Sequence, residues 1–479
     1  MSEEVEIDFK DLIKKIKPIT KKWYFWPLII TALFFIIRLP LINTYQTYWW
    51  DESQYMLMVK HLFKGTTTSG WIPTRSMIHI WLLYFLTLPF GFNELAIKFV
   101  NLLFCLGFSL STYFICKEVF DKKKGISAGI ILACSWIILY WSLRINIDML
   151  NSFLLTLSAL FYIKSLNDKE SKNALMAGLT LGLALTIRFT ALVSGIIYLI
   201  HALIYKREIK QFVWILGVFI GYSPLAIQNL VAYGNPLHTI TAFSGGSGVD
   251  LSFNNELIIN NFTYYLTNIL PSLGVIMGTL FFIGVVFAVL KITNKKVSFI
   301  LFNIIIYLGF YITVGALSDL RFLIHLMPFL IIISLLGASI IFNALRIRKK
   351  TLYCGLIIIT LIICTENLLI GVNSVQGAAN TYLEVKQAAE FLKTYGEGKI
   401  MSNSWPQTAF YSEKETDYLP QNKTTFLNVI NNYSFVIISL YEPHPDYAYE
   451  LNHSFLIPIR VYPSAQDPRL VIYQVNKTN

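Results

Sequence analysis

The stretch "TYWWDESQY" (47–55) follows the apolar run "WYFWPLIITALFFIIRLPL" (23–41), and together these segments decide the fold class. As a helix, the run is long enough to cross about 30 Å of hydrocarbon. It lacks a small-residue cleavage site, so we do not expect a cleavable signal peptide. Adjacent carboxylates, Asp51 and Glu52, come soon after it, framed by aromatic residues. Further long apolar runs recur through residue 372, which predicts an all-α polytopic membrane protein.

The composition supports the same fold class. Of the 479 residues, 55% are hydrophobic and only 14% are charged, whereas soluble domains carry about 25% charged residues. The net charge of +11 comes from Lys and Arg in short segments between apolar runs, which is typical of cytoplasmic loops. We therefore expect a lipid bilayer and no nucleic acid as partner. All five cysteines lie in apolar runs, so neither a disulfide nor a CxxC metal site is predicted.

The basic segments predict the topology. If all of them face the cytoplasm, the apolar runs between them cross in pairs. Eleven crossings are expected, at about 25–43, 95–116, 125–143, 147–164, 173–187, 190–205, 212–230, 270–290, 298–316, 322–345 and 351–372. The shorter run Met77 to Phe92 is expected to be a re-entrant or interfacial helix on the outer face. These assignments predict a multi-pass plasma-membrane protein with a cytoplasmic N-terminus.

Three parts of the chain are expected. Residues 1–24 form a cytoplasmic segment, residues 25–372 a transmembrane catalytic domain whose first outer loop is 44–94, and residues 373–479 an extracytoplasmic α/β domain. In the last part a helix is predicted at 382–395, and strands at 434–440 and 469–475. The Asn-x-Ser/Thr sequons fall on the outer side in this scheme, at Asn261, Asn422, Asn432, Asn452 and Asn476.

Charged residues gather at the outer membrane boundary, where charges near hydrocarbon are expensive and usually functional. The candidates are Asp51, Glu52, Tyr55 and Arg75 in the first loop, Arg144, Asn146 and Asp148 in "RINID", Arg188 in "TIRFT", and Arg321 and His325 in "SDLRFLIHLMP". Structural alternatives exist for each group. The loop acids could be solvated, Arg144 and Asp148 could pair to close their turn, the other arginines could reach lipid headgroups, and His325 could be a satisfied core residue.

Carboxylates beside arginines at this depth suit a donor sugar linked through phosphate to a polyprenyl chain. The lipid tail fixes the phosphate at the interface, where arginines can bind it and stabilise it as a leaving group. A carboxylate can accept the proton of an acceptor hydroxyl. Such an enzyme needs no nucleotide, and the sequence has no glycine-rich phosphate loop.

Five segments resemble the GT-C glycosyltransferases, in the branch that contains protein O-mannosyltransferases, the aminoarabinose transferase of lipid A and Rgt-like enzymes. They are "WWDESQYMLMVKHLFKG" (49–65), "FGFNELAIKF" (90–99), "RINIDML" (144–150), "GLALTIRFTAL" (182–192) and "LRFLIHLMPFL" (320–330). They occur in the family's order over residues 25–372. Lys98 stands where the family usually has arginine, and Arg188 stands where it has lysine. The "WWD" triplet also occurs in oligosaccharyltransferases, but in their large C-terminal domain rather than after the first crossing.

The resemblance implies a role for each matching residue. Asp51 would be the general base for the acceptor, Asp148 a second acid at the donor sugar, and Glu52 a residue that holds the loop or positions the acceptor. Arg188 and Arg321 would contact the lipid phosphate, with Arg75 as a further basic group. The supporting residues would be Tyr55, Arg144, Asn146 and His325. In "IPTRSMIHIW" (72–81), Thr74 replaces a His or Glu of many relatives, which weakens the case for a metal site there.

The sequence therefore predicts an inverting glycosyltransferase, a hexosyl or pentosyl transferase that uses a polyprenyl (dolichyl) phosphate sugar. A divalent ion held by Asp51, Glu52 and Asp148 is left open. One rival is a secondary transporter, although transporter sites usually lie near the membrane midplane between repeats. Another is a scaffold whose outer domain binds partners. The sugar and the acceptor, whether protein, lipid or glycan, are not specified by the sequence.

Overall fold

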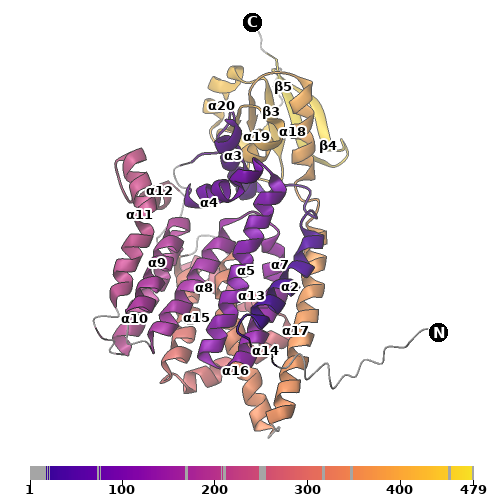
Figure 1. Ribbon diagram of the computed structural model, residues 1–479. Coiled ribbons are helices and arrows are strands. Elements are labelled where there is room, and N and C mark those ends of the chain that lie inside the picture. The colour runs from indigo at the N-terminus through magenta and orange to yellow at the C-terminus, as the bar shows by residue number, and fades with distance from the viewer. Residues whose placement is uncertain are drawn as a thin grey trace, which may run out of the picture.

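A helical bundle carries a smaller α/β domain at one end (Figure 1). The structure is a computed structural model, and it describes residues 18, 20, 22–72, 75, 77–167, 171–205, 208, 212–246, 255–314, 319–345, 349–450 and 455–476. Thr74, the sequon at Asn452 and residues 1–17 lie outside these ranges. The expected fold class, a helical membrane protein with a small C-terminal α/β domain, is confirmed.

The bundle follows the apolar runs of the sequence. Its helices are α2 (Phe25–Arg38), α5 (Glu94–Val119), α6 (Lys122–Cys134), α7 (Trp136–Ser142), α8 (Ile147–Ser165), α9 (Lys172–Ile187), α10 (Leu192–Ile204), α11 (Trp214–Tyr233), α12 (His238–Gly246), α13 (Asn255–Leu273), α14 (Val275–Leu290), α15 (Lys295–Val314), α16 (Met327–Ala344) and α17 (Lys349–Gly377). Short 3-10 helices include η2 (Leu88–Phe90), η3 (Phe189–Ala191) and η5 (Leu320–Leu326).

The expected eleven membrane crossings remain a prediction. Within the described ranges, six helices are long and apolar enough to cross a membrane, or up to eight if each of two bent pairs counts as one span. The pair α6 and α7 bends by 53°, and the pair α13 and α14 by 118°. Several expected crossings, such as α9 with 16 residues and α10 with 13, are short. Hydropathy continues across such breaks, so the sequence pattern does not reveal them.

One helix of this region was not expected. Residues 255–273 form α13, which contains the sequon Asn261. The Asn261 side chain is buried, and its Nδ2 donates a hydrogen bond to the carbonyl of Ile312 over 3.2 Å. This asparagine is therefore inaccessible to a glycosylating enzyme in the folded protein.

Glycines allow α9 and α11 to pack backbone against backbone. A Cβ on Gly178 would lie 1.8 Å from the carbonyl oxygen of Trp214, and one on Gly221 would lie 2.2 Å from that of Leu179. Small residues at such spacing let membrane helices approach closely. The contact fixes the end of α9, where Arg188 is the C-terminal cap.

Two helices of the first loop lie between the bundle and the C-terminal domain (Figure 1). These are α3 (Trp50–Lys64) and α4 (Met77–Thr87), and α4 with η2 accounts for the helix expected from Met77 to Phe92. The middle of α3 is buried on all sides. One apolar cluster joins it to α4, to Ile145 and to Phe410 of α19 (Trp405–Ser412). This packing holds α3 between the two parts of the protein.

The C-terminal domain is a five-stranded sheet covered on both faces. The strands β1 (Ile400–Ser402), β2 (Thr416–Tyr418), β3 (Phe435–Ser439), β4 (Leu456–Pro463) and β5 (Pro468–Val475) lie in the order β2-β1-β3-β5-β4. Strand β1 is parallel to β2 and β3, whereas β5 is antiparallel to β3 and β4. Apolar residues of α18 (Leu383–Tyr395) pack on one face, and Phe426 of α20 (Lys423–Val429) packs on the other.

Candidate active site

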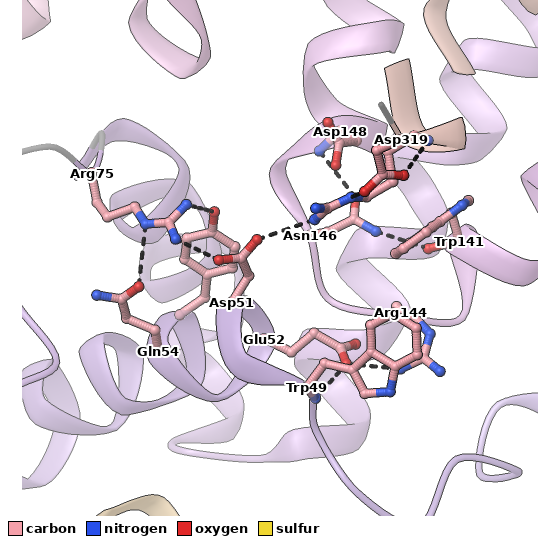
Figure 2. A network of polar contacts seen from close by, with 12 residues as sticks. Trp49, Asp51, Glu52, Gln54, Arg75, Trp141, Arg144, Asn146, Asp148 and Asp319 are labelled. Atoms are coloured by element: carbon pink, nitrogen blue, oxygen red, sulfur yellow. Dashed lines mark hydrogen bonds and ion pairs between the residues drawn. The ribbon is translucent and has the colours of Figure 1, made fainter. Parts of the chain in front are cut away.

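Asp51 stands in the first turn of α3, held between two arginines that are distant in sequence. Its Oδ1 forms a close ion pair with Nη2 of Arg75, and its Oδ2 lies 3.2 Å from Nη1 of Arg321. The N-terminal turn of a helix also favours a negative charge. Figure 2 shows Asp51 and Arg75 pointing toward each other. The structure thus brings together three of the residues singled out from the sequence.

Each arginine is oriented by further contacts. Arg75 donates to the hydroxyl of Tyr55 and to Oε1 of Gln54, both over 3.2 Å. Arg321 Nε donates to Oδ2 of Asp319 over 2.7 Å, and the same carboxylate accepts the backbone N–H of Arg321 over 2.8 Å. Asp319 and Gln54 were missed at the sequence level. Asp319 lies in the stretch "SDLRFLIHLMP", where an acid that precedes a short helix is a cap signal.

Glu52 belongs to a second, separate network. Its Oε2 accepts the backbone N–H of Trp49 over 2.8 Å and lies 3.1 Å from Nη1 of Arg144, while Oε1 accepts the backbone N–H of Ile145 over 2.9 Å. The Arg144 guanidinium lies 3.8 Å from the ring centre of Tyr45 and 3.7 Å from that of Trp49. Figure 2 shows that Glu52 points to Arg144 and away from the Arg75 side. Glu52 therefore ties the start of α3 to the "RINID" loop.

The "RINID" loop places a third ion pair. Asn146 caps α8 by accepting the backbone N–H groups of Asp148 and Met149. Asp148 Oδ1 then lies 3.1 Å from Nη1 of Arg188. The alternative in which Arg144 and Asp148 pair to close the turn is not what forms, because each has a partner from another part of the chain. His325 is buried, with its ring edge-on to Tyr307 and its Nε2 3.3 Å from the hydroxyl of Tyr311.

The networks of Asp51 and of Glu52 border a cavity of about 870 Å³ between the bundle and the C-terminal domain, whereas Arg75, Asp148, Arg188 and His325 are not among its lining residues. Its charged lining residues are Asp51, Glu52, Arg144, Asp319, Arg321 and Glu442, and its aromatic ones are Trp49, Trp50, Trp136, Tyr140, Trp141, Tyr264, Tyr382 and Tyr418. A mostly aromatic pocket with a few convergent polar groups is the usual form of a ligand site. The sequence singled out no residue of the C-terminal domain for this site.

The charges around Asp51 determine its protonation. Burial would raise the pKa of Asp51, but the guanidiniums of Arg75, Arg321 and Arg188 lower it below its ordinary value. Burial raises the pKa of Tyr55 to about 12, although Arg75 opposes this change. At neutral pH Asp51, which lines the cavity, is therefore ionised, and Tyr55 is neutral.

The chain is similar to known proteins in sequence and in fold. Residues 74–227 match the family model described as dolichyl-phosphate-mannose-protein mannosyltransferase. The fold matches ArnT from Cupriavidus metallidurans bound to undecaprenyl phosphate, with 10% identity, a TM-score of 0.65, and coverage of 94% of this chain and 98% of that chain. The chain has the GT-C fold. The resemblance stated from the sequence motifs is thereby confirmed.

A second GT-C structure agrees. The oligosaccharyltransferase of Archaeoglobus fulgidus in the apo form matches with 12% identity and a TM-score of 0.59, over 88% of this chain and 70% of that chain. The archaeal oligosaccharyltransferase AglB from Archaeoglobus fulgidus, in complex with an inhibitory peptide and a dolichol-phosphate, matches with 11% identity and a TM-score of 0.55, over 88% of this chain and 70% of that chain. No curated protein matches the sequence significantly.

The three carboxylates Asp51, Glu52 and Asp148 do not share a metal centre as they are arranged. Asp51, Glu52 and Asp148, the ligands considered from the sequence, each pair with a different arginine. In the described ranges, no group of three or more His, Cys, Asp or Glu side chains is placed to hold a metal ion. What the arrangement offers is a carboxylate base beside guanidiniums, a combination suited to deprotonating a hydroxyl and stabilising a phosphate.

Proposed function

We propose that the protein is an inverting glycosyltransferase that moves a sugar from a polyprenyl-phosphate donor to an acceptor hydroxyl on the extracytoplasmic side of the membrane. The observation that carries the proposal is Asp51, an ionised carboxylate held between Arg75 and Arg321 at the edge of an 870 Å³ cavity. It is supported by the ligands bound to two structural relatives, undecaprenyl phosphate in ArnT and a dolichol-phosphate in AglB.

Asp51 is the general base. An Oδ atom accepts the proton of the acceptor hydroxyl, whose oxygen forms the new bond to the anomeric carbon. The bond from that carbon to the phosphate oxygen breaks, and its electron pair stays on the lipid phosphate. Because attack and departure take place on opposite faces of the carbon, the anomeric configuration inverts.

The guanidiniums bind the donor phosphate. Arg321 is the central one, because its contacts to Asp51 and Asp319 fix its plane beside the base. Arg188, placed by Asp148, and Arg75, placed by Tyr55, are the further cations. Arginine suits this role because its fork of N–H donors matches phosphate oxygens. Asp148 shapes the donor sugar site, and Glu52 with Arg144 positions the helix that carries Asp51.

The charge pattern supports this side of the membrane. Lys and Arg are concentrated in short segments between the apolar runs of the sequence, and the positive-inside rule assigns such segments to the cytoplasm. The cavity and the C-terminal domain then face the outside of a plasma membrane. The transporter alternative is disfavoured because the charged groups gather beneath this domain rather than near the midplane of the bundle.

The experiment is transfer by the purified full-length protein from radiolabelled polyprenyl-phosphate sugars to a membrane extract. We expect the label to leave one donor of the panel, and the product to have the opposite anomeric configuration. Retention of configuration would contradict the direct displacement. Failure of every donor with a folded protein would contradict the function.

A further inference from the structure

The C-terminal domain contributes one wall of the cavity. Asn403, Tyr418, Glu442 and Pro443 line it together with Asp51. The domain contacts α3 and the residues just before it: Nζ of Lys60 in α3 lies 2.8 Å from Oε1 of Glu413, and the hydroxyl of Tyr411 accepts the backbone N–H of Tyr48 over 2.9 Å. These contacts hold the wall in place beside Asp51. The side chains of the wall can therefore select which molecule binds on this side of the cavity.

Glu442 differs from the other acids of the cavity because its side-chain partners are neutral. Gln407 Nε2 lies 3.4 Å from its Oε1, and Tyr382 donates a further hydrogen bond. Asp51, Glu52 and Asp319 each pair with an arginine. For Glu442 no ion pair occurs within the described part of the chain. Its negative charge is thus left uncompensated at the cavity wall.

The segment that carries Glu442 is held firmly. The amide of Asn403 donates to the carbonyl oxygens of Ser439 over 2.7 Å and of Glu442 over 3.0 Å, and its Oδ1 accepts the backbone N–H of Ser439 over 2.9 Å. A buried residue thereby closes the loop after β3. A carboxylate on a fixed backbone is suited to selecting a ligand, because little conformational entropy is lost when the ligand binds.

Aromatic rings from both parts of the protein line the same cavity as this acid. Trp50 of α3 lies edge to face with Tyr418 and with Trp405, each at a ring separation of 6.0 Å. Tyr382 lies 6.1 Å from Trp49. Aromatic faces accommodate the apolar C–H faces of sugar rings, while carboxylate and amide oxygens accept the hydrogen bonds of their hydroxyls. The combination fits a carbohydrate.

The charge of the wall also excludes ligands. Of the two guanidiniums in the described lining, that of Arg144 is paired with Glu52, and that of Arg321 binds the donor phosphate in the proposed function. A phosphate or carboxylate on the acceptor would approach Glu442, and the described lining residues of the C-terminal wall include no Lys or Arg to balance it. Like charges repel each other, which is a means of rejecting the wrong partner.

We propose that Glu442 binds a hydroxyl of a neutral, hydroxyl-rich acceptor glycan and excludes acceptors that carry a phosphate or carboxylate beside the accepting hydroxyl. The proposal rests on the proposed glycosyltransferase function and names the acceptor class for its site. Glu442 is a binding residue in this account and takes no part in the proton transfer by Asp51.

The test is a binding titration on the full-length protein in detergent, followed by tryptophan fluorescence, since four tryptophans line the cavity. The probes are neutral trisaccharides of mannose, glucose, galactose and N-acetylglucosamine, and the 6-phosphate of each. We expect at least one neutral trisaccharide to bind about tenfold more tightly than its phosphate. Glu442→Gln should weaken that binding about tenfold, and Glu442→Lys should favour the phosphate. Glu390→Gln, on an exposed carboxylate of α18, is the matched control.

Three results would overturn the inference: no neutral trisaccharide binds, the phosphates bind equally well, or Glu442→Gln leaves the affinity within about twofold of the wild type. Undecaprenyl phosphate binding is measured in parallel on every variant. It reports folding, and its absence in the wild type would count against the proposed donor alone. Saccharide binding that depends on Glu442 would still support the acceptor site in that case.

Discussion

Oδ2 of Asp51 lies 3.2 Å from Nη1 of Arg321, although 270 positions separate the two residues in the chain. The contact joins the first turn of α3 to the short helix η5 at the start of α16. Because Arg321 is also bound to Asp319, the proposed base and the central proposed phosphate ligand form one preorganised unit. A phosphate that binds Arg321 is thereby placed beside the carboxylate that deprotonates the acceptor.

Arg188 is expected to contribute directly to donor binding. Arg188→Ala removes a charge-assisted contact, which should weaken undecaprenyl phosphate binding by about 1.5–3 kcal/mol. The change also leaves Asp148 without its cation, so Arg188→Lys, which retains a positive charge, is the control for folding. Equal donor affinity in the wild type and in Arg188→Ala, measured by titration, would argue that Arg188 serves only to hold Asp148.

The pH dependence of transfer should report on Asp51. The pKa of Asp51 is lowered by Arg75, Arg321 and Arg188 against the effect of burial. The base therefore stays ionised at pH values below the ordinary aspartate range, and kcat should fall on the acid side only below that range. Arg75→Met removes the largest lowering influence and should move this limb to higher pH. The measurement is kcat at saturating donor across pH, with Arg75→Lys as the charge-preserving control. An unmoved limb would show that Asp51 is not the titrating base.

Two acids of the cavity, Asp51 and Glu442, should titrate at different pH values. Burial raises the pKa of Glu442, and Asp51 raises it further, although hydrogen bonds from Tyr382 and Gln407 oppose this. As the pH falls, Glu442 should therefore be protonated before Asp51. KM for the acceptor is expected to change at a higher pH than kcat does, and this difference should vanish in Glu442→Gln. Coincident changes of KM and kcat in the wild type would contradict the assignment.

Glu52 is expected to act on stability more than on chemistry. It is buried with Arg144, and Glu52→Gln leaves that guanidinium without its counter-charge. Removing one partner of a buried pair costs about 3–5 kcal/mol, so the thermal midpoint of the purified protein should fall. Glu413→Gln, which alters a half-exposed acid paired with Lys60, should change it much less. Equal midpoints for Glu52→Gln and the wild type would exclude the structural role.

Much of the site could be predicted because charges stand out against apolar sequence. Asp51, Arg75 and Arg321 are each predicted from their expected place at the outer membrane boundary, and the structure joins them. Which acid pairs with which arginine could not be predicted from the neighbouring sequence. Arg144 and Asp148 lie near each other in the chain, yet tertiary packing gives each a distant partner.

Other features depend on geometry that hydropathy does not encode. The bend of 118° between α13 and α14 falls inside an apolar region, so the expected crossing at 270–290 missed the helix before it. Glu442 lies in a polar domain whose sequence has no periodic signal that points to the bundle. Its position in the cavity follows from how the domain docks on α3, through contacts such as that of Tyr411 with Tyr48.

The most direct test of the account is the rate at which purified protein transfers label from a polyprenyl-phosphate sugar, measured for the wild type and Asp51→Asn. The substitution keeps the size of the side chain and removes the base, so thermal midpoint and undecaprenyl phosphate binding serve as controls for folding. We predict that Asp51→Asn folds, binds the lipid phosphate and loses at least about 99% of transfer, in line with the 10²–10⁴-fold contribution typical of general base catalysis. Transfer at near wild-type rate by the folded Asp51→Asn protein would contradict the central claim.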